Sequence, residues 1–326
     1  MLKKHLSILF FILISFAVFA NAVQAEDIDY LSWEDVKELG YTSPLVVTAV
    51  VDSTVYGLIL EKNTVFSWNI GEKGIKDYMQ YKPISLGREV ILFKERSRKE
   101  QEALLNYPSS FFEKDSELWA FNQYSYKIGK IEPSGIEWIM QLDKANTNET
   151  YIFAKDFFAH GSYIFAKIKD TKKVYGTLQV WELPSGKGKE LNVPGMYIAL
   201  PYKEGQALAI CNIYTEKPKF TVVDLATGTM NDLPVKMPFP CKDNSWDPLC
   251  ESYPLLPFDG FVYDESSDTI LFSAFGKLWA STNNSDFHET VEVSLSETPF
   301  PENGWILPDG RYAARSGAGV CIRNWK

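Results

Sequence analysis

VWELPSGK, residues 180–187, and VVDLATGT, residues 222–229, are two copies of one pattern. Each copy is an apolar run that ends in an acidic residue, followed by a Leu and a turn built on Ser-Gly or Thr-Gly. Glu182 and Asp224 hold the same place in the pattern, 42 positions apart. An apolar run, a Gly-containing turn and a second run predict an antiparallel hairpin. The chain therefore repeats a hairpin unit.

Self-similarity at a period of about 40–50 residues is typical of the blades of a β-propeller. Further hairpins of this kind are predicted along the chain, starting at Thr54, Ser116, Gly176, Lys219 and Gly276. All except the first follow an earlier apolar strand pattern, and the longer gaps between them contain insertions. Five hairpins and a final segment predict an all-β fold: a single β-propeller with six blades, with seven left open by the length of the chain.

That final segment, WILPDGRYAARSG at residues 305–317, places Pro308-Asp309-Gly310 between two strand-like runs. Proline presets φ for a turn, Asp can accept from its own backbone, and Gly tolerates a positive φ. The segment resembles the turn between the inner strands of blades in TolB-like and WD-repeat propellers, and the two quoted hairpins resemble their outer strand turn. The resemblance implies the fold. It transfers no catalytic residue, because these motifs occur in propellers of unrelated activity.

The start of the chain predicts export. Lys3 and Lys4 precede an apolar run, residues 6–20, and small residues continue to Ala25. This layout predicts a signal peptide over residues 1–25, with an uncleaved anchor as the alternative. The mature chain would begin at Glu26 and be secreted or periplasmic, with no stable membrane insertion, because no later apolar run reaches the length of a spanning helix.

After the signal peptide, residues 26–42 are predicted to form a leader with one short helix outside the ring, from Ser32 to Gly40. Ser32 can cap such a helix and Gly40 can end it. Residues 43–326 are predicted to be the propeller domain. A strand around residues 45–51 is expected to join the last blade, which would close the ring and remove a free edge.

Charge and cysteines narrow the classes of partner. The chain has a formal net charge of −9, which becomes −11 once the signal peptide is removed, and it has no basic stripe for binding nucleic acid.

Cysteines pair by default in an exported protein. Cys241 and Cys250 flank a short polar loop and are predicted to form a disulfide, whereas Cys211 and Cys321 are predicted to be free thiols in blades that do not touch.

The same loop is the candidate ligand-binding site. Trp246 offers contact area within a polar stretch, and Asp243 and Asp247 offer acceptors or a weak cation site. A disulfide and flanking prolines would reduce the freedom that the loop loses on binding. The alternative is that the disulfide loop only stiffens the exported protein.

No catalytic residue can be assigned from the sequence. It contains no GxSxG, GxGxxG or GxxxxGK[ST] motif, and His160 and His288 stand without the spacing of metal ligands. Acidic side chains at predicted strand or loop edges are the remaining candidates: Asp52, Asp156, Asp243, Asp247 and Asp259. Their spacing does not bring any two of them together.

These observations favour an exported β-propeller that acts as a scaffold for binding a protein or glycan ligand. The alternative is a hydrolase of glycans or lactones, since propellers of that kind use carboxylates or a central calcium ion at the mouth of the channel. No other cofactor is indicated. A mainly structural role in the cell envelope is a third hypothesis.

Overall fold

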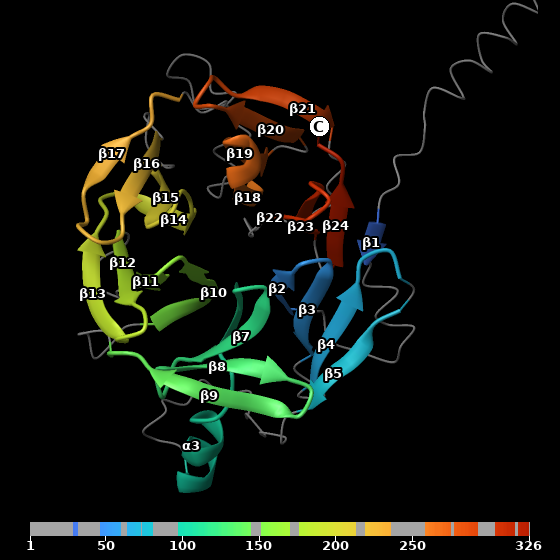
Figure 1. Cartoon of the computed structure of the whole chain (residues 1–326), viewed down its shortest axis with the longest axis vertical. Coiled ribbons are helices and arrows are strands. Elements are labelled where there is room, and N and C mark those ends of the chain that lie inside the picture. Colours follow the sequence, from blue (N-terminus) through green and yellow to red (C-terminus); the bar gives the residue numbers. More distant parts are fainter. Residues whose placement is uncertain are drawn as a thin grey trace, which may run out of the picture.

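Figure 1 shows a ring of β-sheets around a central axis. The computed structural model describes residues 29–31, 46–59, 64–72, 74–80, 97–144, 151–169, 176–212, 219–235, 258–274, 277–292, 304–316 and 319–325. Their strands form six antiparallel sheets of four strands each, and each sheet has one edge strand nearest the axis and the other at the outside of the ring. The expectation of a single all-β propeller is confirmed. Within these ranges no helix is both long and apolar enough to cross a membrane.

The first three sheets follow one another along the chain. The first contains β2 (Val46–Val51), β3 (Thr54–Ile59), β4 (Thr64–Asn69) and β5 (Lys76–Gln80). The second contains β6 (Ser110–Lys114), β7 (Glu117–Asn122), β8 (Lys127–Glu132) and β9 (Gly135–Gln141). The third contains β10 (Tyr151–His160), β11 (Tyr163–Lys169), β12 (Thr177–Glu182) and β13 (Lys187–Asn192).

The other three sheets complete the order. The fourth contains β14 (Met196–Pro201), β15 (Gln206–Cys211), β16 (Lys219–Asp224) and β17 (Met230–Asp232). The fifth contains β18 (Phe258–Asp264), β19 (Thr269–Ala274), β20 (Lys277–Thr282) and β21 (His288–Glu292), with a short 3-10 helix, η2 (Glu265–Ser267), after β18. The sixth contains β22 (Gly304–Ile306), β23 (Tyr312–Ser316), β24 (Gly319–Arg323) and β1 (Asp29–Leu31).

The predicted hairpins are present, and the two quoted turns have the same geometry. The N–H of Gly186 donates to the carbonyl of Glu182, and the N–H of Gly228 donates to that of Asp224, both at 2.8 Å. Both glycines have a positive φ, 68° and 76°. Only a residue without a Cβ adopts that conformation without strain. The repeat in the sequence is therefore a repeat of one turn, placed between the third and fourth strands of neighbouring sheets.

The strand that completes the sixth sheet is β1, which pairs with β24 so that Asp29 lies opposite Ile322. The expectation that residues 45–51 would do this was wrong, because Val46–Val51 is the innermost strand of the first sheet. Val50 packs toward the sixth sheet, and Ala49 and Val51 pack toward the second. A strand that is apolar on both faces belongs between two neighbours rather than at an outer edge. Residues of the leader, 26–42, therefore contribute to the ring.

The hydrophobic core consists of six clusters, each shared by two consecutive sheets. On β15, Leu208 and Ile210 face the fifth sheet, while Ala207, Ala209 and Cys211 face the third. This follows from the two-residue period of a strand, since successive side chains point to opposite faces. Each fully buried Leu or Ile contributes about 1.5–3 kcal/mol.

One helix is described, α3 (Arg98–Leu104), which projects outward from the second sheet in Figure 1. Ser97 and Glu100 form a capping box: the Ser97 hydroxyl accepts from the N–H of Glu100, whose carboxylate accepts from the N–H of Ser97. The buried Asn122 amide donates to the carbonyls of Leu104 and Tyr107 and so ties this excursion to β7. The helix predicted from Ser32 to Gly40 lies outside the described residues.

Candidate functional site

The site predicted from the sequence falls where the structure gives no description. Cys241, Cys250, Asp243, Trp246 and Asp247 all lie in the range 236–257, outside the described residues. The disulfide and the loop hypothesis therefore stay predictions.

The cysteines on strands can be placed. Cys211 is a free, buried thiol on β15, as predicted, and burial raises the pKa of its thiol, so the thiol stays neutral at pH 7. Cys321 lies on β24. The fourth and sixth sheets that carry these two residues are separated by the fifth, as the predicted register requires.

A cavity of about 450 Å³ lies on the ring axis, and we call it the axial cavity. It is lined by the ends of the innermost strands of all six sheets: β2, β6, β10, β14, β18 and β22. Most of the residues that line it are apolar, including Phe111, Phe112 and Phe157, although polar atoms contribute about as much of the accessible wall surface as apolar atoms do. Three larger side chains, Phe158, Tyr263 and Trp305, are only partly buried. The size and the apolar lining are those of a ligand pocket.

The cavity opens among the turns that join the first and second strands of the sheets, which we call the first-turn face. Each turn contains at least one residue with a positive φ of 47–84°: Asp52, Asp115 and Ser116, Gly161, Gly205, Asp268 and Gly310. A tight reversal at the end of the innermost strand demands this conformation, which Gly adopts freely and Asp adopts more readily than most residues. Asp in place of Gly has a chemical consequence, because it adds a carboxylate to this face.

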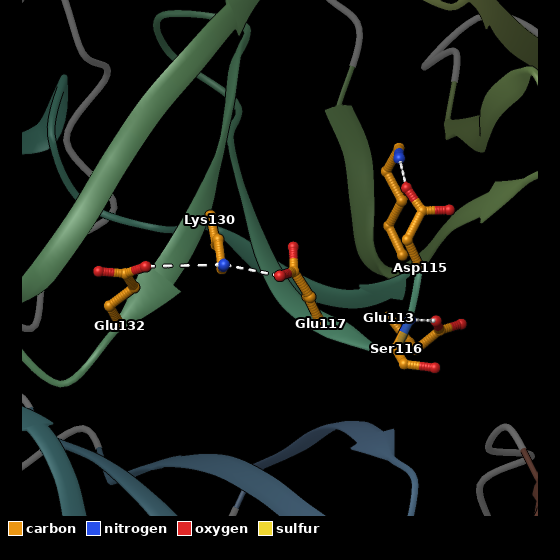
Figure 2. A network of polar contacts seen from close by, with 7 residues as sticks. Glu113, Asp115, Ser116, Glu117, Lys130 and Glu132 are labelled. Atoms are coloured by element: carbon orange, nitrogen blue, oxygen red, sulfur yellow. Dashed lines mark hydrogen bonds and ion pairs between the residues drawn. The ribbon is translucent and has the colours of Figure 1, made fainter.

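Two carboxylates lie at the rim of the axial cavity, those of Asp52 and Glu113. Glu113 Oε1 accepts from the N–H of Ser116 at 2.7 Å, so it is held by its own hairpin (Figure 2). Both Asp115 and Ser116 have a positive φ, 55° and 58°, which is the conformation of a type I′ hairpin turn. The rim is thus acidic and fixed in position by the backbone.

Among the described residues, no group of three or more His, Cys, Asp or Glu side chains is placed to hold a metal ion. Asp156 lies on β10 and Asp259 on β18. Asp52, one of the five acidic candidates from the sequence, lines the cavity, whereas Asp243 and Asp247 lie outside the described residues. His288 is exposed on β21, and His160 donates its Nε2–H to the carbonyl of Lys203 at 2.9 Å, a bond between two turns.

A second polar group on the same face joins the fourth and fifth sheets. The ammonium of Lys203 lies 3.0 Å from Asp268 Oδ1, and the Tyr263 hydroxyl donates to the same oxygen at 2.6 Å. These two contacts lower the pKa of Asp268, the hydrogen bond from Tyr263 having the larger effect. Burial, and then the bond to Asp268, raise the pKa of Tyr263. Tyr263 is therefore held as a neutral donor with its ring in the cavity wall.

Sequence reasoning missed most of this site. Glu113, Ser116, Tyr263 and Trp305 were not singled out as ligand-binding residues, although Trp305 begins the segment that contains the Pro-Asp-Gly turn. One usable signal was present: an Asp directly after an apolar run, as at Asp52, marks a first turn with a carboxylate. The arrangement can hold an apolar group on the axis with a cation or hydroxyl donor beside it.

Comparisons with known proteins place the chain by fold only. No protein-family model matches it, and no curated protein matches it in sequence. A gluconolactonase from Xanthomonas campestris, XC5397, is 9% identical, with 86% of each chain covered and a TM-score of 0.52. YCF48, solved bound to a D1 peptide, is 11% identical, with 92% of this chain and 97% of that chain covered and a TM-score of 0.52. At these identities the likeness shows one thing, that this chain folds as a β-propeller.

Proposed function

We propose that the protein is an extracytoplasmic binding protein that takes an apolar side chain of a partner protein into the axial cavity. The observation that carries this proposal is the composition of the cavity. All six sheets contribute to its wall, whose lining residues are mostly apolar, with the carboxylates of Asp52 and Glu113 among them. The volume, about 450 Å³, lies within the usual range for sites that enclose small ligands or side chains.

The walls of the cavity are fixed before binding. The Tyr263 ring lies 4.3 Å from the Tyr202 ring, and the Phe158 ring lies 5.6 Å from that of Phe165. A site whose side chains are already ordered loses little conformational entropy on association. Large aromatic side chains in such a position are typical of the residues that dominate binding energy. YCF48, which has the same fold, is bound to a peptide in its solved structure.

The test is titration of the mature protein with the blocked dipeptide acetyl-Phe-Gln-amide, followed by NMR or calorimetry. We expect saturable binding that Trp305→Ala weakens about 5-fold or more, because a wall of the cavity is lost. Trp138→Ala is the matched control, since Trp138 lies on β9, away from the axis. Absence of saturable binding to the parent protein, or equal losses in both folded variants, would contradict the proposal.

The second candidate function is hydrolysis of a lactone or glycan. The observation that favours it is the pair of carboxylates, Asp52 and Glu113, at the mouth of the cavity. Asp52 would act as the general base, and a calcium ion is the cofactor to test. Glucono-1,5-lactone in a pH-stat, with calcium or EDTA, separates the two functions: hydrolysis above background that Asp52→Asn abolishes favours the enzyme, and an unchanged background rate rejects it for this substrate.

The export and the loop belong to the same proposal. A mature N-terminus near Glu26 follows from the signal-peptide layout, and N-terminal sequencing of the exported protein tests it. The loop with the Cys241–Cys250 disulfide would add a second contact through Trp246. Non-reducing peptide mapping tests the disulfide. Trp246→Ala in folded protein tests the contact, which is rejected if the partner of the parent binds the variant equally well.

The ring itself is proposed to have six blades. In support, six sheets are described, and each of the six core clusters joins two consecutive sheets, including the sixth and the first. β1 would then be the closing strand. A crystal structure of the mature protein tests the count, and a seventh sheet would overturn it.

A further inference from the structure

A second cavity, of about 360 Å³, lies on the first-turn face at the boundary of the first and second sheets. We call it the side groove. Asp52 and Ser116 line both this groove and the axial cavity. The two hollows therefore adjoin each other at these two residues.

One wall of the groove is aromatic. The rings of Tyr56 on β3 and Tyr78 on β5 meet edge to face, with centroids 5.1 Å apart and planes at 72°. Both are partly buried, and burial is the main reason that the pKa of each hydroxyl is raised. Glu132 lines the same groove, and its negative charge also raises the pKa of Tyr78, whereas the charge of Lys130 lowers it. The rings thus present aromatic surface beside negative charge.

The other wall carries charge from the second sheet alone. The Lys130 ammonium lies 2.6 Å from Glu117 Oε1 and 3.6 Å from Glu132 Oε1 (Figure 2). The hydrogen bond with Glu117 is the main reason that the pKa of Lys130 is raised, so the side chain stays protonated. Two carboxylates share one ammonium, and Asp52 adds a third carboxylate. The groove therefore has an excess of negative charge.

This combination selects among ligands by charge. An ammonium or guanidinium group is attracted by carboxylates and by the faces of aromatic rings, and its apolar stem can lie along those rings. An anion would meet an excess of carboxylates, and the single ammonium is already paired. A neutral side chain would gain only contact area. The chain as a whole has a net charge of −9, which also favours a basic partner.

We propose that the side groove binds a Lys or Arg side chain of the segment whose apolar side chain occupies the axial cavity. The partner is then a protein with a basic residue next to an apolar one. This inference rests on the proposed function, because it takes the axial cavity as the place where the segment is held. The axial cavity alone does not specify the charge of the partner segment. The side groove adds the requirement that the residue next to the apolar one be positively charged.

The experiment compares three blocked dipeptides, acetyl-Phe-Lys-amide, acetyl-Phe-Gln-amide and acetyl-Phe-Glu-amide, each also in the reversed order. For the residue order that binds better, we expect the Lys dipeptide to bind about 5-fold more tightly than the Gln dipeptide of the same order. We expect the Glu dipeptide to bind most weakly. Raising the salt concentration should reduce the difference, because the groove is partly exposed to solvent.

Two variants locate the effect. Glu132→Gln should reduce the preference for Lys over Gln while leaving the affinity for the Gln peptide unchanged. Glu182→Gln is the matched control, because Glu182 is an exposed carboxylate on the third sheet. It should leave all the affinities unchanged.

The outcomes separate the two proposals. Binding of the Gln peptide with no preference for Lys would overturn the side-groove proposal and leave the axial cavity standing. A Lys preference that survives in Glu132→Gln, or that is lost equally in Glu182→Gln, would also overturn it. If none of the peptides binds, both proposals fail.

Discussion

The boundary between the fourth and fifth sheets and the boundary between the first and second sheets contain the same types of residue: a lysine, acidic side chains and two tyrosines. The two boundaries arrange these residues differently. At the boundary of the fourth and fifth sheets, Lys203 and Tyr263 both contact one oxygen of Asp268, at 3.0 Å and 2.6 Å. Lys203 lies in the turn after β14, whereas Tyr263 and Asp268 belong to the fifth sheet. The Tyr202 ring packs on that of Tyr263 at 4.3 Å. This ion pair crosses the boundary and holds the two sheets together.

At the boundary of the first and second sheets the ion pairs stay within one sheet. Lys130, Glu117 and Glu132 all belong to β7 and β8 of the second sheet. The two tyrosines, Tyr56 and Tyr78, both belong to the first sheet. The groups that could bridge the sheets are paired within their own sheet, and a hollow of about 360 Å³ lies between them. The same residue types therefore have opposite effects at the two boundaries. A lysine that pairs with a carboxylate of the next sheet braces the boundary, whereas a lysine that pairs within its own sheet leaves a groove.

The largest expected difference between the two boundaries is in packing. Tyr202 is 4% exposed, so Tyr202→Ala should lower the free energy of unfolding by about 3 kcal/mol, the loss typical of a buried aromatic side chain. Tyr78 is only partly buried, and Tyr78→Ala should cost about 1 kcal/mol. Urea denaturation measures both. Equal losses would mean that the groove is packed as tightly as the braced boundary.

The next effect is the loss of one hydroxyl. Tyr263→Phe removes the donor to the charged Asp268 carboxylate and should cost about 1 kcal/mol, because hydrogen bonds to charged groups are stronger than neutral ones. Tyr78→Phe provides the comparison at the groove, where we expect a change of less than about 0.5 kcal/mol. If Tyr263→Phe proves as stable as the parent, the contact does not brace the boundary.

A smaller effect depends on pH. The pKa of Asp268 is lowered in the folded protein, so its contribution to stability is present above its unfolded pKa and is lost as the pH falls through the folded value. Asp268→Asn keeps a residue that tolerates the positive φ and removes only the charge. The parent should be more stable than this variant by about 0.5 kcal/mol at pH 7, after allowing for screening at this partly exposed pair. The difference between the two sets of denaturation curves should narrow as the pH falls below the ordinary Asp pKa of about 3.9; a constant difference would contradict this assignment.

The smallest effect on stability is expected at Lys130. Its raised pKa means that its ion pairs persist at pH 7 and weaken only above the ordinary pKa of a lysine, but the group is partly exposed and its pairs lie within one sheet. Lys130→Gln should therefore leave the denaturation midpoint unchanged. It should increase the affinity for acetyl-Phe-Lys-amide, because a competing cation is removed. A clear loss of stability would show that Lys130 braces the groove.

Much of the fold can be predicted from the sequence because its signals are local. A Gly that must have a positive φ, as Gly228 has at 76°, marks a turn without reference to the rest of the chain. The Pro308-Asp309-Gly310 turn is as predicted: Asp309 accepts from the N–H of Arg311 at 3.0 Å, and Gly310 has a φ of 84°. The continuous apolar run along β15, from Ala207 to Cys211, predicts a strand that is buried on both faces.

The closing strand and the site were decided only by the tertiary structure. A three-residue strand such as β1 has no pattern of its own, and its place depends on the free edge of β24, nearly the whole chain length away. The axial cavity combines residues from Ala49 to Pro308, and no spacing in the sequence relates them. The side groove depends on whether Lys130 meets a carboxylate of its own sheet or of the next one. The sequence determined the strands and turns because each depends on a few consecutive residues, whereas the cavity and the charge pairing depend on how the sheets meet around the axis.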